Sequence, residues 1–118
     1  MTIDGQSIDP PEVQLSAPTQ EQGEWFVVAR NQRVNHSWEK LIQRHPENTA
    51  RCYQYLCSTP TQRYPGRIFP LKGKKYRGAW EYELTGGDRV FYVPDEVNKK
   101  VVVYYADKHP KGKSPTPP

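Results

Sequence analysis

LKGKKYRGAWEYELTGGDRVFYVPDEVNKKVVVYYADKHPK, residues 71–111, is the most informative segment of this chain, because it predicts three antiparallel strands in succession. In its first strand, apolar side chains alternate with Glu81 and Glu83, which is the period of a half-buried strand. Gly86 and Gly87 then predict a tight hairpin, since glycine readily adopts the positive φ that such turns require. Valine and aromatic residues, which favour strands, are abundant after this turn. The predicted strands are residues 80–84, 90–93 and 101–105.

The rest of the chain has to cover one face of this meander, because a small antiparallel sheet is not stable alone. Residues 24–30, EWFVVAR, predict a further strand, and its apolar side chains on both faces indicate a central position. A helix with an apolar stripe follows over residues 31–45, with Asn31 as its N-cap. Pro46 ends that helix and begins a second one, which stops before Pro60.

These elements predict an α+β fold with two layers and the order β-α-α-β-β-β, in which an αα-hairpin packs on a small, mostly antiparallel sheet. The first strand is expected to lie beside a strand of the meander. Residues 67–71 are expected to pair briefly at a sheet edge, where Pro70 is tolerated. The other face of the sheet is expected to stay open, as a basic and partly aromatic surface.

The two ends of the chain differ from its middle in composition. Residues 1–23 hold four acidic side chains and no Lys or Arg, and they predict a disordered acidic leader. Residues 112–118, GKSPTPP, predict a disordered Pro-rich tail, which leaves 24–111 as the domain. Residues 24–118 carry all 17 Lys and Arg but nine of the 13 Asp and Glu, a formal charge of +8. That charge favours a polyanion such as nucleic acid as the partner; a merely charged, soluble surface is the alternative.

The cysteine content points to a reducing compartment. Cys52 and Cys57 lie in one predicted helix, which does not bring them to disulfide distance, so we expect two buried thiols. No apolar run approaches the ~20 residues of a membrane span. We therefore expect a cytoplasmic protein with no metal site, no cofactor and no membrane partner.

The order and spacing of these pieces resemble the RelE/ParE superfamily of toxins from type II toxin–antitoxin systems, and the RelE-like branch most closely. The resemblance covers about residues 24–111. It rests on LKG, WEYEL, a glycine-rich turn, DRVFY and a valine-rich strand that ends near a histidine. It implies a small α+β toxin that cleaves mRNA in the ribosomal A site and a cognate antitoxin protein that neutralises it.

The resemblance also implies roles for single residues. Arg89 matches the arginine that RelE-like toxins place against the scissile phosphate, and His109 falls where several members carry a histidine proposed as general acid. The best-known member has two lysines where this chain has Glu81 and Glu83. Other members take a carboxylate from an earlier loop, at the position of Phe69 here. Basic side chains expected to contact RNA are Lys72, Lys74, Lys75, Arg77, Lys108 and Lys111.

The residue types fit the chemistry of RNA cleavage by its own 2′-hydroxyl, which needs a base, an acid and a cation. The Arg89 guanidinium suits the cation role because it forms bidentate bonds to phosphate. His109 suits the acid role because an unperturbed histidine titrates near neutrality. Glu81 or Glu83 is the candidate base.

Several alternatives stay open. A ParE-like gyrase inhibitor would have the same fold, and a non-catalytic RNA-binding module would account for the missing lysines. Arg89 beside Glu83 is otherwise a cross-strand ion pair, and residues 72–77 are otherwise a solvated loop. His45 is assigned to the helix surface without a role.

The register of the hairpin decides which face Arg89 occupies. A two-residue loop, Gly86-Gly87, would place Arg89 on the core face, whereas a three-residue loop that includes Thr85 places it opposite Glu83. We predict the three-residue loop, because Val90 and Tyr92 then lie beneath the helices.

Overall fold

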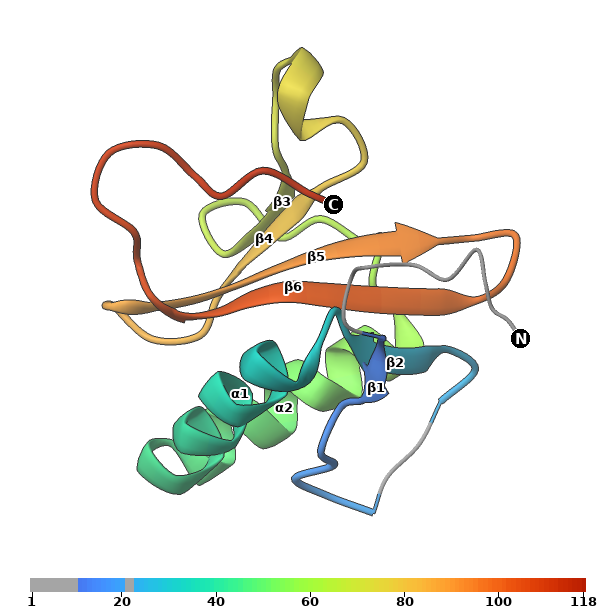
Figure 1. Ribbon diagram of the computed structural model, residues 1–118, viewed down its shortest axis with the longest axis vertical. Coiled ribbons are helices and arrows are strands. Elements are labelled where there is room, and N and C mark those ends of the chain that lie inside the picture. Colours follow the sequence, from blue (N-terminus) through green and yellow to red (C-terminus); the bar gives the residue numbers. More distant parts are fainter. Residues whose placement is uncertain (1–10, 21–22) are drawn as a thin grey trace.

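The computed structural model describes residues 11–20 and 23–118. In these residues two α-helices and one six-stranded mixed sheet form an α+β fold, which confirms the predicted class. Figure 1 shows both helices on one side of the long strands β5 and β6. The elements are β1 (Val13–Gln14), β2 (Phe26–Ala29), α1 (Gln32–Arg44), α2 (Pro46–Ser58), β3 (Ile68–Pro70), η1 (Lys74–Tyr76), β4 (Trp80–Glu83), β5 (Asp88–Asp95) and β6 (Lys100–Lys108).

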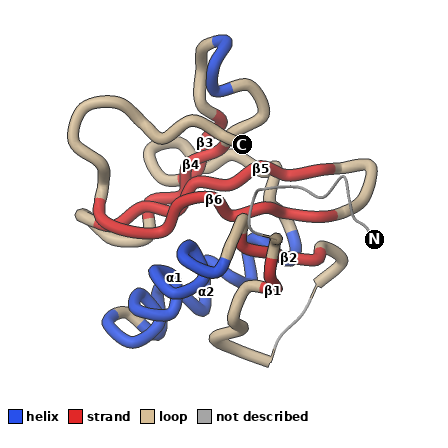
Figure 2. Tube along the Cα trace, viewed as in Figure 1, coloured by secondary structure: helices blue, strands red, loops and turns tan. Residues whose placement is uncertain are grey.

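The strand order is β1-β2-β6-β5-β4-β3. The chain leaves β2 through the two helices, re-enters the sheet at the β3 edge, and returns strand by strand until β6 lies beside β2 (Figure 2). β2 and β6 are therefore parallel, while the other neighbouring strands are antiparallel. The predicted position of the first strand beside the meander and the predicted edge strand around Pro70 are both confirmed.

The two helices begin and end where their capping residues predict. The Asn31 side chain accepts a hydrogen bond from the backbone N–H of Val34 (3.0 Å) and so satisfies one free donor of the first turn. Pro46 occupies the first turn of α2, where its missing N–H costs nothing. Trp38 and Leu41 face the sheet and are fully buried. Cys52 and Cys57 are buried free thiols, as predicted.

The sheet face opposite the helices is not fully open, which corrects the expectation of an open surface. Phe91 and Tyr104 are buried there in a second, smaller core together with Ala79. The register shifts between Phe91 and Tyr92, so Tyr104 is the extra residue of a β-bulge. The Phe91 ring centroid lies 6.2 Å from that of Tyr104 and 5.5 Å from that of Tyr105.

Part of the cover over this second core comes from the C-terminal tail. Residues 112–118 have no helix or strand, but the Tyr104 hydroxyl donates a hydrogen bond to the Pro115 carbonyl (3.0 Å). Figure 1 shows the tail crossing from the end of β6 toward β3 and β4. The predicted disordered tail is thus held against the sheet at Pro115.

The predicted disordered leader needs a correction as well. Residues 11–20 include β1, which pairs with β2, and Leu15 is buried in the main core. The indole N–H of Trp38 donates to the Ser16 carbonyl (2.7 Å), and the Ser16 N–H donates to Asn35 Oδ1 (2.9 Å). The folded part therefore begins before residue 24. Residues 1–10 and 21–22, also assigned to the leader, lie outside the described residues.

Neither helix in the described ranges has the length and apolar character needed to cross a membrane.

Candidate functional site

The hairpin between β4 and β5 places Arg89 on the face that carries the two glutamates. Arg89 pairs with Glu83, and the Leu84 N–H donates to the Asp88 carbonyl (3.0 Å), which leaves residues 85–87 as a three-residue loop. Val90 is fully buried in the core beneath the helices. The predicted register is confirmed, because side chains of a strand alternate between the two faces.

The Arg89 guanidinium is already bound by groups of its own hairpin. Its Nε donates to Glu81 Oε2 (3.0 Å), and its Nη2 lies 3.8 Å from Glu83 Oε2. Its Nη1 donates to the carbonyls of Thr85 (2.8 Å), Asp88 (3.1 Å) and Gly86 (3.3 Å). The Arg89 side chain is only 12% exposed, so these bonds hold it in one place. Of the three guanidinium nitrogens, Nη2 has the weakest contact, because Glu83 Oε2 lies 3.8 Å away.

Glu81 and Glu83 differ in how far solvent reaches them. The Glu81 side chain is 8% exposed and that of Glu83 is 33% exposed. Burial raises the pKa of Glu81, and the nearby charges of Arg89 and His109 oppose that rise. Glu81 therefore serves as the buried anchor of Arg89, whereas Glu83 is the carboxylate that a ligand can reach.

His109 lies just beyond β6, at the same end of the sheet. Its backbone N–H donates to the Gly87 carbonyl (2.8 Å), which ties the end of β6 to the hairpin loop. Its charge is one of the influences that lower the pKa of Glu81, but its imidazole forms no hydrogen bond or ion pair with the described residues. His109 is exposed. We call Glu81, Glu83, Arg89 and His109 the hairpin-end cluster; the structure brings all four predicted catalytic candidates to one end of the sheet.

The six predicted RNA contacts are all exposed, and none forms an ion pair with another described residue. Lys108 and Lys111 flank His109 at the end of β6. The other four lie on the connection between β3 and β4, which joins β4 at Trp80, the end away from Glu83. Lys75 Nζ lies 5.6 Å from the centroid of the neighbouring Tyr76 ring.

Tyr104 packs with Phe91 on the face of the sheet opposite the helices. Burial raises the pKa of Tyr104, and the charges of Tyr76 and Glu81 add to the rise. Tyr76 belongs to the basic connection and Glu81 to the cluster. The two ends of the connection, Leu71 and Ala79, pack with Phe91 and Tyr104 on the face of the sheet that also carries Arg89.

A supporting contact of the hairpin was not predicted. Asp88, which is 7% exposed, lies 3.2 Å from His45 Nε2 and 3.7 Å from Arg44 Nη2. Thr85 Oγ1 accepts from the Asp88 N–H (2.9 Å) and closes the loop. His45 therefore joins the corner between the helices to the hairpin, which corrects its assignment to a surface position without a role. No sequence pattern signals a pair so far apart in the chain.

Comparison of the chain with protein-family models and with curated protein sequences finds no match.

Proposed function

We propose that this chain is the toxin of a type II toxin–antitoxin system, a RelE-like endoribonuclease that cleaves mRNA on the ribosome and so arrests translation. The observation that carries the proposal is the hairpin-end cluster, in which an arginine, two carboxylates and an exposed histidine lie at one end of the sheet beside exposed lysines. The order of elements, with paired helices on one face of a sheet that ends near His109, supports a RelE-like arrangement. A cognate antitoxin and the ribosome are the implied partners.

When the RNA substrate binds, its phosphate replaces one of the groups that Arg89 contacts. The Glu83 carboxylate lies 3.8 Å from Nη2, so this contact is the weakest in the set, and a phosphate displaces it most easily. Glu81 keeps its 3.0 Å bond to Nε and holds the guanidinium in position. The exchange gives the phosphate a charge-assisted bond and frees the Glu83 carboxylate to act as a base.

The cleavage step then follows from these positions. The 2′-oxygen attacks the adjacent phosphorus while its proton passes to Glu83. The bond from phosphorus to the 5′-oxygen breaks, and protonated His109 donates a proton to that leaving oxygen. The products are a 2′,3′-cyclic phosphate and a 5′-hydroxyl. Arg89 stabilises the additional negative charge on the phosphorane, and the base and the acid each contribute about 10²–10⁴-fold.

A non-catalytic RNA-binding module is the second candidate. One specific observation favours it, because Arg89 is bonded to Glu81 and three carbonyls and is largely buried. In that case the exposed lysines bind RNA by charge, and the hairpin-end cluster only stabilises the sheet.

Induced expression in a bacterial host tests the proposal. Wild-type protein should stop growth and translation with cleavage of cellular mRNA, and Arg89→Ala and His109→Gln should relieve the arrest. Lys40→Ala, at an exposed position on α1, is the matched control and should stay toxic. Unaffected growth with the wild type contradicts the proposal. A DNA-damage response with intact mRNA would assign the chain to the gyrase inhibitors, and tight RNA binding without cleavage would assign it to the second candidate.

A further inference from the structure

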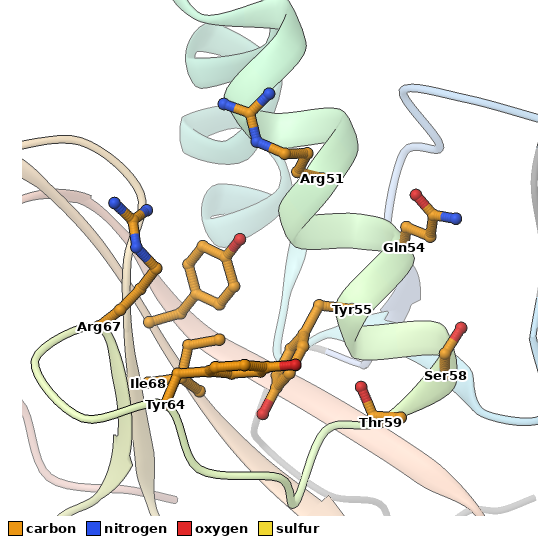
Figure 3. Close-up of a pocket in the computed structure, with 9 residues that line it drawn as sticks. Arg51, Gln54, Tyr55, Ser58, Thr59, Tyr64, Arg67 and Ile68 are labelled. Atoms are coloured by element: carbon orange, nitrogen blue, oxygen red, sulfur yellow. The ribbon is translucent and has the colours of Figure 1, made fainter.

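A pocket of about 560 Å³ lies on the helix side of the sheet, between α2 and the segment that leads into β3. Figure 3 shows Arg51 on α2 and Arg67 on the facing segment, with the rings of Tyr55 and Tyr64 between these two elements. Tyr82 of β4 also lines the pocket. We call these five residues the arginine–tyrosine pocket. The side chain of Tyr82 belongs to the main core beneath the helices, so the pocket and the hairpin-end cluster lie on opposite faces of the sheet.

The two cations of this pocket have no acidic partner among the described residues. Arg51 and Arg67 are both exposed, and neither forms an ion pair there. Arg67 makes one long hydrogen bond, from Nη1 to the Glu83 carbonyl (3.4 Å). Two guanidinium groups are thus available to an anion without first breaking a salt bridge.

A buried hydroxyl lies close to both cations. Tyr82 is only 6% exposed, and its hydroxyl has no hydrogen-bond partner in the part of the chain that the structure describes. Arg51, Arg67 and Tyr82 line the same pocket; burial raises the pKa of Tyr82, and the charges of the two arginines oppose the rise. Because Tyr82 lines the pocket, its hydroxyl is free to donate a hydrogen bond to a group bound there.

The aromatic side chains give the pocket a flat apolar wall. The ring centroid of Tyr55 lies 6.1 Å from that of Tyr64 and 5.6 Å from that of Tyr82. The Tyr55 hydroxyl donates to the Gln62 carbonyl, which fixes its ring. Tyr64 is 46% exposed, so its ring can stack against a planar group. The pocket volume falls within the range of roughly 300–1,000 Å³ typical of small-molecule sites.

We infer that the arginine–tyrosine pocket binds a nucleotide, with the phosphate between Arg51 and Arg67 and the base against the ring of Tyr64. The Tyr82 hydroxyl, which lines the pocket, then donates to a phosphate oxygen. A phosphate fits this donor set better than a carboxylate, because its oxygens can accept from both guanidiniums and the hydroxyl together. The nucleotide is either free or one unit of an RNA strand, since both present a phosphate and a stackable base.

Calorimetric titration of the full chain tests this inference with three probes: AMP, inorganic phosphate and hexa-adenylate RNA. AMP should bind more tightly than phosphate. Arg51→Gln and Arg67→Gln should each weaken AMP binding about tenfold, because each removes a charge-assisted bond. Arg63→Gln, in the same segment but outside the pocket, is the matched control and should leave AMP binding unchanged. Tyr64→Ala should weaken AMP binding but not phosphate binding.

The Tyr82→Phe variant shows whether the Tyr82 hydroxyl contacts the ligand or stabilises the fold. The substitution keeps the ring and removes a hydroxyl that has no described partner, so the melting temperature should not fall. AMP binding should weaken about fivefold, by the loss of one hydrogen bond.

The RNA probe distinguishes the two sources of the nucleotide. If hexa-adenylate binding responds to the Arg51, Arg67 and Tyr64 substitutions as AMP binding does, the pocket takes a unit of an RNA strand. If only AMP binding responds, the ligand is a free nucleotide. Equal affinity for phosphate and AMP, or no AMP binding at millimolar concentration, would overturn the inference. Binding of tetraglutamate that depends on both arginines, in the absence of AMP binding, would assign the pocket to an acidic peptide instead.

Discussion

The hairpin-end cluster and the arginine–tyrosine pocket lie on opposite faces of β4, and they differ in what their cations already bind. Arg89 is 12% exposed and bonded to Glu81 and three carbonyls. Arg51 and Arg67 are exposed, with no acidic partner among the described residues. The cluster must therefore exchange a partner before it can bind phosphate, whereas the pocket can bind an anion without any exchange.

The largest expected effect comes from breaking the buried ion pair. Arg89→Met leaves the Glu81 carboxylate buried without its cation, so the free energy of unfolding should fall by about 3 kcal/mol. Arg51→Met removes an exposed charge and should change it by about 0.5 kcal/mol or less. Urea unfolding measures both. The double variant Glu81→Leu, Arg89→Met should recover much of the loss, because no lone charge remains. If Arg89→Met and Arg51→Met lower the free energy of unfolding equally, the two regions do not differ in how strongly their arginines are bound.

The next effect concerns RNA binding on the side of the hairpin-end cluster. Substituting both Lys74 and Lys75 by Gln should lower the slope of log affinity against log salt by about 1.4, since each phosphate contact on a single strand contributes about 0.7. The control is the double variant Arg33→Gln, Lys40→Gln on α1, which removes two exposed charges from the helical layer. Filter binding at several salt concentrations gives the slopes. An identical decrease in the control would mean that RNA binds by net charge alone.

A smaller effect is expected from the tail. Ending the chain after Ser114 removes Pro115, which accepts from the Tyr104 hydroxyl, but keeps Lys111 and Lys113. In the full chain, RNA has to displace the tail and break this hydrogen bond, which is worth about 1 kcal/mol. Removal of the bond should therefore raise RNA affinity about fivefold. Tyr104→Phe should raise the affinity similarly by releasing the same contact. Weaker binding by the shortened chain would show instead that the tail contacts RNA.

The smallest effect is the titration of Glu81. Burial raises the pKa of this carboxyl above its ordinary value of 4.5, so the folded protein holds the proton more tightly than the unfolded chain. The contribution of this group to stability is therefore complete below that ordinary value and is lost as the pH rises through the folded-state pKa. Carbon-13 NMR of the carboxyl should give a midpoint above 4.5, and Arg89→Met should raise it further by removing the nearest cation. A midpoint below 4.5 would mean that the pairing with Arg89 outweighs burial.

The two helices, the strands from residue 26 onward and the face of Arg89 could be predicted because they depend on local pattern. Strand alternation, glycines at the turn and the requirement that Val90 lie beneath the helices decide the register. β1 could not be predicted, because a strand of two residues carries too little pattern and is held by distant contacts of Leu15 and Ser16.

The features of the site that could not be predicted from the sequence depend on contacts between distant segments. The cover over the second face needs a bulge at Tyr104 and a tail that folds back to reach it. The Asp88–His45 pair joins a hairpin to a helix corner. The arginine–tyrosine pocket likewise combines residues of α2, β4 and the segment before β3, which no single stretch of sequence identifies.

The most direct test of the account is cleavage of a defined mRNA by purified protein on programmed ribosomes, with wild type and His109→Gln compared. His109 is exposed, so this variant should keep its fold and its RNA affinity. The wild type should leave cuts with 2′,3′-cyclic phosphate ends, and cleavage by His109→Gln should be slower by about 10²–10⁴-fold. Intact mRNA with the wild type, or equal cleavage by both proteins, would contradict the assignment of the hairpin-end cluster as a nuclease site.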